Sequence, residues 1–398
     1  MPGLVLGATS AAKAVDFKMT GLWQNRVSFA DRNFEKHNGD DKMRAATRLR
    51  TQIDVIASES LKGVMFFEIG HQNWGKAAEG AALGTDGKEI KVRYSYVDWI
   101  IPQTDVKVRM GLQPYVQPTF TGIGSPILDA DGAGITISNQ FTENVSASLF
   151  WLRAENDNDP EMTKHDAHDA MDFIGVTVPM TFDGVKVTPW AMVGMIGRDS
   201  LDTDKDAISQ KGGLIPIQAD ISPDALKDRH NTAWWVGVAS ELTYFDPFRI
   251  AVDAAYGSVD MGSYKTLDGR TIRDFDVKRA GWFASILGEY KMDYFTPGIL
   301  FWYASGDDSN AYNGSERMPA ISPCGNFTSF VGDDPTGFGM LVSGLNATYD
   351  LQLNYAGTWG LGIQIKDVSF IEDLTHTLRI ARWAGTNSPA MIKYLATA

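Results

Sequence analysis

Arginine side chains recur on one side of the segment from residue 42 to residue 56. Arg44, Arg48 and Arg50 share a face if this segment is a β-strand, because successive strand side chains point to opposite faces. The other face carries mainly apolar residues such as Leu49. A row of guanidinium groups attracts anions and forms strong hydrogen bonds with carboxylates and phosphates. The segment therefore predicts a strand with one cationic face and one apolar face.

Further basic residues fall on the same polar phase of neighbouring segments. We predict a cationic, pore-lining face made of Lys18, Arg26, Arg44, Arg48, Arg50, Arg93, Lys107 and Arg109. Later segments add Lys186, Arg249, Asp253, Arg279, Glu289, Gln364, Lys366 and Arg379 on that phase. If the face lines a water-filled passage, its charge favours anions over cations. The alternative is that the arginines only pair with acidic neighbours and leave no net field.

The side chains of this face would be positioned by about fifteen stretches in which polar and apolar residues alternate. Alternation with a period of two is typical of strands that have two different faces. We predict strands over residues 16–30, 42–57, 62–74, 90–101, 105–117, 133–140, 144–154, 171–181, 185–197, 232–244, 248–258, 279–290, 295–305, 357–370 and 374–386.

The breaks between these stretches alternate between short and long. The long ones are 31–41, 75–89, 118–132, 155–170, 198–230, 259–277 and 306–356. Bacterial outer-membrane barrels have short turns on one side of the membrane and long loops on the other. The pattern therefore predicts an all-β fold, a transmembrane antiparallel β-barrel with about fifteen strands in this chain and about 16 to 18 in the full protein. A barrel of that size encloses an aqueous channel.

Aromatic residues cluster near both ends of the predicted strands. Those beside the short turns include Trp99, Phe141, Phe182, Phe245 and Phe370. We expect a second girdle near the long loops, made of Trp74, Trp151, Tyr256, Trp302 and Trp383. Aromatic rings favour the level of the lipid headgroups, so two such girdles indicate a membrane-spanning sheet.

Composition excludes two other classes of protein. No run of eighteen apolar residues is present and the mean hydropathy is −0.17, which excludes a helical membrane protein. The formal net charge of −13 argues against a nucleic-acid partner, which needs a basic face. No Pro/Ser-rich linker divides the chain, so residues 15–398 are predicted to form one β-barrel domain.

Both ends of the chain carry further signals. Leu4–Ala8 is apolar and Ala12–Ala14 resembles a cleavage site, so we interpret residues 1–14 as the remnant of a secretory signal peptide that is cut before Val15. The alternative is a soluble tail. Single-chain bacterial barrels have an even number of strands, whereas the count here is odd. We therefore expect the domain 15–398 to be C-terminally incomplete.

Three segments carry a resemblance to a known family. They are Phe17–Trp23, Pro297–Asp308 and Ser369–Arg379, of which the last is the most specific. On these residues the chain resembles the outer-membrane homotrimeric porins of sulfate-reducing bacteria, over essentially all of residues 15–398. The resemblance implies a homotrimer of passive diffusion channels. It does not extend to the signal-peptide start or the closing strands of that family.

The third long break, 118–132, is the candidate constriction loop. Phe120 and Ile123 are apolar residues that would be unfavourable on an exposed tip. Folding into the lumen would bury them, as in general porins. Asp129 and Asp131 would then face the cationic residues of the opposite wall. The alternative is an ordinary loop that packs on a neighbouring subunit of the trimer.

Other motifs point to chemistry less clearly. Asp202–Asp206 opens like a calcium-binding loop but is not followed by the glycine and the final glutamate of an EF-hand. The segment 155–172 is rich in carboxylates, which could bridge lipopolysaccharide through divalent ions. Cys324 is the single cysteine and is interpreted as a loop residue. We expect no metal site and no cofactor.

The function most consistent with these features is a general diffusion porin of the bacterial outer membrane. It would pass small hydrophilic solutes with a modest preference for anions. A structural or adhesive outer-membrane barrel and a substrate-specific channel are the alternatives. We find no Ser/His/acid arrangement around any of the six histidines, so an enzyme is not expected. Expected partners are outer-membrane lipid, lipopolysaccharide and further copies of the chain as a homotrimer.

Overall fold

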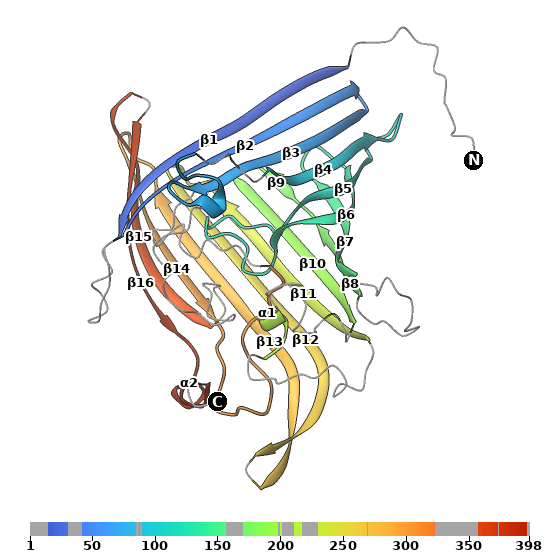
Figure 1. Cartoon of the computed structure of the whole chain (residues 1–398), viewed down its shortest axis with the longest axis vertical. Coiled ribbons are helices and arrows are strands. Elements are labelled where there is room, and N and C mark those ends of the chain that lie inside the picture. The colour runs from blue at the N-terminus through green and yellow to red at the C-terminus, as the bar shows by residue number, and fades with distance from the viewer. Residues whose placement is uncertain are drawn as a thin grey trace, which may run out of the picture. The chain divides into compact units, whose positions relative to one another are not determined.

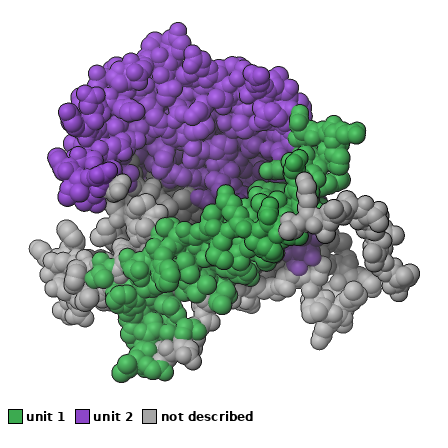
Figure 2. Space-filling model, turned by 90° about the horizontal axis from the view of Figure 1, so that it is seen from above, with its two compact units in different colours: residues 1–113 green, residues 114–398 purple. Residues whose placement is uncertain are grey.

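Strands make up most of the described chain. The computed structural model describes residues 15–30, 42–84, 87, 90–156, 170–197, 200, 211–216, 230–268, 270–322, 357–372 and 374–395. Contacts divide the chain into two compact units, Met1–Gln113 and Pro114–Ala398, which Figure 2 colours separately. Neighbouring strands within each unit pair antiparallel, which confirms the predicted all-β antiparallel fold. Among the described residues, no helix is long and apolar enough to cross a membrane.

Unit 1 is an antiparallel meander in which each strand pairs with the next along the chain. Its strands are β1 (Asp16–Ala30), β2 (Lys42–Ser58), β3 (Leu61–Asn73), β4 (Ile90–Ile100) and β5 (Lys107–Val116), the last of which runs on into unit 2. The register places Lys18 opposite Asp54, Arg50 opposite Glu68, and Asp98 opposite Arg109. These side chains define the polar face of unit 1. The opposite face exposes apolar residues such as Phe17.

Unit 2 holds the remaining strands, which are labelled in Figure 1. They are β6 (Asp129–Gln140), β7 (Ser146–Asn156), β8 (Ala170–Thr177), β9 (Met180–Phe182), β10 (Val185–Gly197), β11 (His230–Leu242), β12 (Phe248–Asp268), β13 (Thr271–Tyr290), β14 (Thr296–Ala304), β15 (Thr358–Ile371) and β16 (Leu374–Gly385). Three short helices complete the described elements: η1 (Ala77–Glu79) in unit 1, and α1 (Lys211–Leu214) and α2 (Pro389–Leu395) in unit 2.

The predicted strand 171–181 is divided in the structure. β8 ends at Thr177 and β9 begins at Met180, and both pair with β10. Pro179 lies between them and has no N–H to donate to the ladder. One predicted strand is therefore observed as two, and most of the other strand boundaries agree within two residues.

The prediction of a long loop at 259–277 is wrong. β12 and β13 continue through this region as a hairpin in which Asp268 pairs with Thr271, the yellow extension in Figure 1. A register shift lies between Asp260 and Ser263. Beyond it, Tyr264 and Phe275 pack with their ring centroids 5.1 Å apart. The segment holds many charged residues, which exposed positions of a strand can carry.

β13 shows how the two faces of unit 2 differ. Every second residue from Phe275 to Glu289 is buried, and the residues between them, among them Trp282, are more exposed. We call the buried side the inner face of unit 2 and the other side its outer face. Cross-strand pairing puts Trp302 of β14 opposite Ser285, and thus on the inner face. Trp302 is fully buried, so its assignment to the exposed aromatic girdle is wrong.

A tight turn after β3 depends on one carboxylate. Glu79 accepts hydrogen bonds from the backbone N–H of Asn73 at 2.7 Å, from the side-chain amide of Asn73 at 2.8 Å and from Lys76 Nζ at 2.8 Å. The hydrogen bond from Lys76, followed by that from the Asn73 backbone, lowers the pKa of Glu79 from 4.5 to about 2. Because the folded-state pKa is lowered, this contribution to stability is complete above pH 4.5 and is lost as the pH falls toward 2.

Acid is therefore expected to loosen residues 73–80. Hydrogen exchange of this peptide should accelerate between pH 5 and pH 2, relative to the Glu79→Gln variant at each pH. The variant lacks the ionisable carboxylate, so its exchange rate should not show this additional acceleration at low pH. Equal pH dependence in both proteins would mean that the carboxylate does not hold the turn.

Candidate functional site

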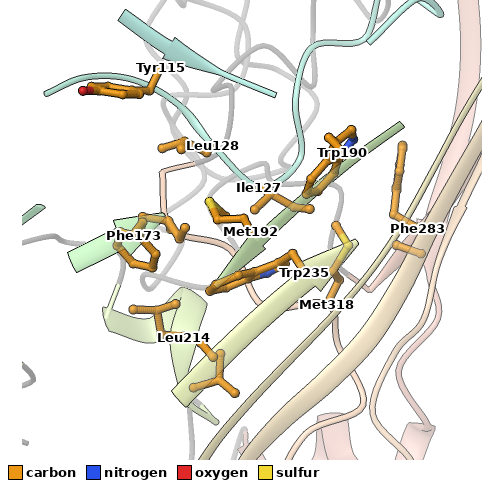
Figure 3. Packing of buried hydrophobic residues seen from close by; sticks show 14 of the residues in the cluster. Tyr115, Ile127, Leu128, Phe173, Trp190, Met192, Leu214, Trp235, Phe283 and Met318 are labelled. Carbon is orange, nitrogen blue, oxygen red and sulfur yellow. The ribbon is translucent and has the colours of Figure 1, made fainter. Parts of the chain in front are cut away.

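The segment that follows β5 folds back onto the inner face of unit 2. Ile123, Ile127 and Leu128 are almost completely buried there. They belong to one apolar cluster with Met192 of β10 and Trp235 of β11, and Figure 3 shows Ile127 among these side chains. The loop that runs from residue 117 to residue 128 is therefore a packed part of the interior, and we call it the inner loop.

Two charged side chains of β12 hold the inner loop by its backbone. Asp253 accepts hydrogen bonds from the N–H groups of Phe120 at 2.8 Å and Thr121 at 2.9 Å, and a further one from the Thr121 hydroxyl. Arg249 donates from Nη2 to the Phe120 carbonyl at 2.8 Å. The Ser285 hydroxyl of β13 lies 2.9 Å from that of Thr121. Asp253 is buried, and these hydrogen bonds offset the cost of removing its charge from water.

A second segment covers the inner face beside the inner loop. The Trp235 indole N–H donates to Pro319 O at 3.0 Å, and Ala320 N donates to Gly213 O, within α1, at 2.7 Å. Ile321 N donates to Ile127 O at 2.9 Å, which joins this segment to the inner loop. Residues 311–322 therefore lie inside, although the sequence predicts 306–356 as an outer loop. Residues 323–356 of that loop, including Cys324, are outside the described residues.

A belt of alternating charges crosses the inner face from β10 to β16. Its ion pairs join Lys186 to Glu241 at 2.9 Å, Glu241 to Arg249 at 2.6 Å, Arg249 to Glu289 at 2.8 Å and Glu289 to Lys366 at 2.6 Å. Gln364 extends it by donating to Glu289 at 2.8 Å and accepting from Arg379 at 3.2 Å. Each of the two carboxylates is shared by two cations, so the belt carries a surplus of positive charge.

The polar face of unit 1 follows the same principle. The Glu68 carboxylate lies 2.7 Å from Arg50, 3.9 Å from Arg48 and 4.0 Å from Arg93. Arg48 also donates twice to Gln24 Oε1, at 2.9 and 2.6 Å, and is almost fully buried. Several cations therefore surround one acid, and the positive charge is in excess at this point.

A second group on this face lies around Asp98. Arg109 binds its carboxylate with two hydrogen bonds, at 2.6 and 2.9 Å, and Lys107 Nζ lies 3.9 Å away. Next to it, Lys62 lies 3.7 Å from Asp54. The arginines do pair with acidic neighbours, as the alternative interpretation requires, but the acids are too few on this face to cancel the cations.

The structure places the predicted site residues as follows. Lys18 is exposed on β1, and the side chains of Arg26 and Arg44 lie outside the described part of the structure. Phe120 and Ile123 belong to the inner loop. Asp129 and Asp131 belong to β6, so the expected loop boundary at residue 132 is wrong. The loop is anchored instead by Asp253 and Arg249, which sequence reasoning placed on the polar phase without assigning them this contact.

Comparisons with known proteins find similar chains only among solved structures, and three of them are described here. No family model and no curated protein matches the chain. Among solved structures, the chain is similar to the outer membrane channel DcaP of Acinetobacter baumannii, with 12% identity over 95% of this chain and 93% of that chain and a TM-score of 0.45. It is similar to OccAB3 of the same species, with 11% identity, 92% and 82% coverage and a TM-score of 0.48.

The third is outer-membrane expressed OmpT of Vibrio cholerae, with 11% identity over 95% of this chain and 89% of that chain and a TM-score of 0.44. None of the three TM-scores reaches 0.5, so the proposal below rests on the residues of this chain.

Proposed function

We propose that this chain belongs to a transmembrane β-barrel and forms a diffusion channel in the bacterial outer membrane. The observation that carries the proposal is the division of the strands into an exposed apolar face and a charged inner face. On β15, Leu361 and Ile363 are 49% and 52% exposed, while Gly362 and Gln364 between and beside them are buried. Soluble proteins rarely expose apolar surface over many strands, whereas a membrane-spanning barrel requires it.

The ends of the strands support the same placement. Phe141, Phe182, Tyr244, Phe245 and Phe370 are exposed close to the short turns. Trp74, Trp151, Tyr256 and Trp383 are exposed toward the other end. Such rings suit the two headgroup levels of a bilayer. The assembly as a homotrimer is supported by the family resemblance alone.

The channel is proposed to favour small anions over cations of similar size. In the ion pairs of the polar face of unit 1 and of the inner face of unit 2, each cation except Arg48 is more exposed than the carboxylate that it pairs with. Lys107 is 40% exposed beside Asp98 at 9%, and Lys366 is 31% exposed beside Glu289 at 2%. A passing ion therefore meets ammonium and guanidinium groups first. The net charge of −13 belongs to the whole chain, and charges on exposed loops are screened beyond about 8 Å at physiological salt.

A planar-bilayer recording under a KCl gradient tests this function. We expect channels that insert in groups of three equal conductance steps. The reversal potential should be displaced from zero toward the equilibrium potential of chloride. Replacing Lys107 and Lys366 by Gln should lower the chloride-to-potassium permeability ratio, by about twofold. Neither change leaves a carboxylate without a cation, because Asp98 keeps Arg109 and Glu289 keeps Arg249.

Arg270→Gln is the matched control, since it removes a positive charge from the exposed tip of the β12–β13 hairpin. It should leave the permeability ratio unchanged. No conductance from folded protein would contradict the channel. A cation-selective wild type would contradict the anion preference alone.

A substrate-specific channel is the second candidate. It is favoured by the inner loop and residues 311–322, which fill part of the inner face of unit 2 with packed side chains. Liposome swelling distinguishes the two candidates. A general diffusion porin should pass neutral solutes of equal size at equal rates, whereas a substrate-specific channel should not.

A further inference from the structure

Three aromatic rings form a row on the polar face of unit 1, where most neighbours are charged. Phe66 of β3 stacks on Tyr94 of β4, with ring centroids 4.8 Å apart and an interplanar angle of 22°. Tyr94 and Tyr96 follow at 6.4 Å. All three rings are half-buried, so each keeps part of its surface open. We call Phe66, Tyr94 and Tyr96 the aromatic strip.

Two arginines flank the aromatic strip. The guanidinium carbon of Arg109 lies 4.1 Å from the centroid of Tyr96. That of Arg93 lies 5.7 Å from Tyr94 and 5.9 Å from Phe66. All three distances fall within the range of cation–π contacts. The strip therefore combines ring faces with fixed positive charge.

A β-bulge brings Arg93 to this face. Phe66 pairs with Tyr94, but the next residue, Phe67, pairs with Val92, so Arg93 is the extra residue of β4. In a regular strand the neighbour of Tyr94 would point to the opposite face. Bulges re-aim side chains in this way and are frequent next to functional sites.

The position opposite Tyr96 is a glycine. Gly111 of β5 pairs with Tyr96 and has φ +125°, a backbone conformation that favours glycine. A Cβ at this position would lie 2.3 Å from Ser95 O. The paired position of β5 therefore carries no side chain over the Tyr96 ring. The Arg109 guanidinium covers one face of that ring and is itself 23% exposed.

We propose that the aromatic strip is a binding site for planar aromatic carboxylates that pass through the channel. The solute ring would pack against the exposed parts of Tyr94 and Tyr96 that Phe66 and Arg109 leave open, and its carboxylate would lie against Arg93 or Arg109. Organic cations are disfavoured by both arginines, and inorganic anions gain nothing from the rings. The passage, but not the binding itself, rests on the proposed function, in which the polar face of unit 1 lines the lumen.

Benzoate is the probe, with acetate as the anion that lacks a ring and benzyl alcohol as the ring that lacks a charge. Binding to the folded protein in detergent micelles is measured by saturation-transfer NMR. Block of the chloride current by benzoate is measured in bilayers. We expect benzoate to bind about tenfold more tightly than either control, because each control lacks one of the two contacts and a single ring contact or charge contact supplies an effect of this size.

Replacing all three residues of the strip by Leu should remove this tenfold difference, whereas Tyr94→Phe with Tyr96→Phe should keep it. The matched control is Phe67→Leu with Trp99→Leu, which removes rings from the opposite face of the same strands. Should the triple variant fail to fold, Arg109→Gln combined with Asp98→Asn removes one charge contact without leaving a buried carboxylate unpaired, and it should weaken benzoate binding by itself.

Channels that conduct but bind benzoate no better than acetate would contradict the proposed binding site and leave the proposed channel function standing. Loss of binding in the opposite-face control would also overturn it. Binding that depends on the strip in a protein that forms no channels would overturn the proposed function and leave the binding site.

Discussion

Replacing Asp253 by alanine is expected to release the inner loop and to give channels with a higher and noisier conductance. The carboxylate holds the N–H groups of Phe120 and Thr121 and the Thr121 hydroxyl. Hydrogen bonds to a charged group contribute about 1.5–3 kcal/mol each. A net loss equal to one such hydrogen bond raises the undocked fraction of the loop about tenfold or more. Single-channel recording measures the conductance and the open-state noise.

Asp253→Asn should be milder, because the amide oxygen still accepts a hydrogen bond from the loop backbone. Asp293→Ala removes an exposed carboxylate from the turn between β13 and β14 and is the control for the loss of charge. Unchanged conductance in folded Asp253→Ala channels would show that the apolar residues of the loop, not this carboxylate, keep it docked.

Replacing Gly360 by valine is expected to prevent folding of unit 2. A Cβ at Gly360 would lie 2.1 Å from two carbons of the Trp302 indole. Trp302 is fully buried and donates to Thr358 Oγ1 at 3.3 Å, so it has no open space to move into. Overpacking of a core costs typically about 1–3 kcal/mol and occasionally more, and this overlap involves a whole indole.

The refolding yield in detergent and the urea midpoint measure this effect. Gly288→Val is the matched control, since nothing lies within 4 Å of a Cβ built on Gly288 of β13. Folded Gly360→Val protein with a wild-type midpoint would contradict the assigned packing of Trp302.

The strands could be predicted from the sequence because alternation is a local property. β10 was expected and found at residues 185–197, and β1 at residues 16–30. The sequence does not readily show which residues of a strand face inward when glycines precede and follow the residue in question. Gly298 and Gly306 do so for Trp302. Alternation alone then does not decide which face an indole takes, and the cross-strand neighbours Ser285 and Gly360 do so instead.

The candidate site was predicted less well, because its contacts are made between distant parts of the chain. The apolar character of Phe120 and Ile123 indicated an inward loop, but nothing near them in sequence identifies Asp253 as their anchor. Arg48 was expected among the exposed lining residues, yet it is buried, because Gln24 and Glu68 reach it from both neighbouring strands. The register between neighbouring strands decides which charged side chains are buried, and the alternation of polar and apolar residues does not give that register.

The inner loop also has a consequence for the order of folding. The Phe120 amide and its acceptor Asp253 are 133 residues apart in sequence, and the Thr121 and Ser285 hydroxyls are 164 apart. Contacts of such high sequence separation form late, because the intervening chain must be ordered first. The neighbouring hairpins of the sheet need only local pairing. A nascent chain would therefore complete β12 and β13 before the loop could dock, and until then its apolar residues would be available to a chaperone.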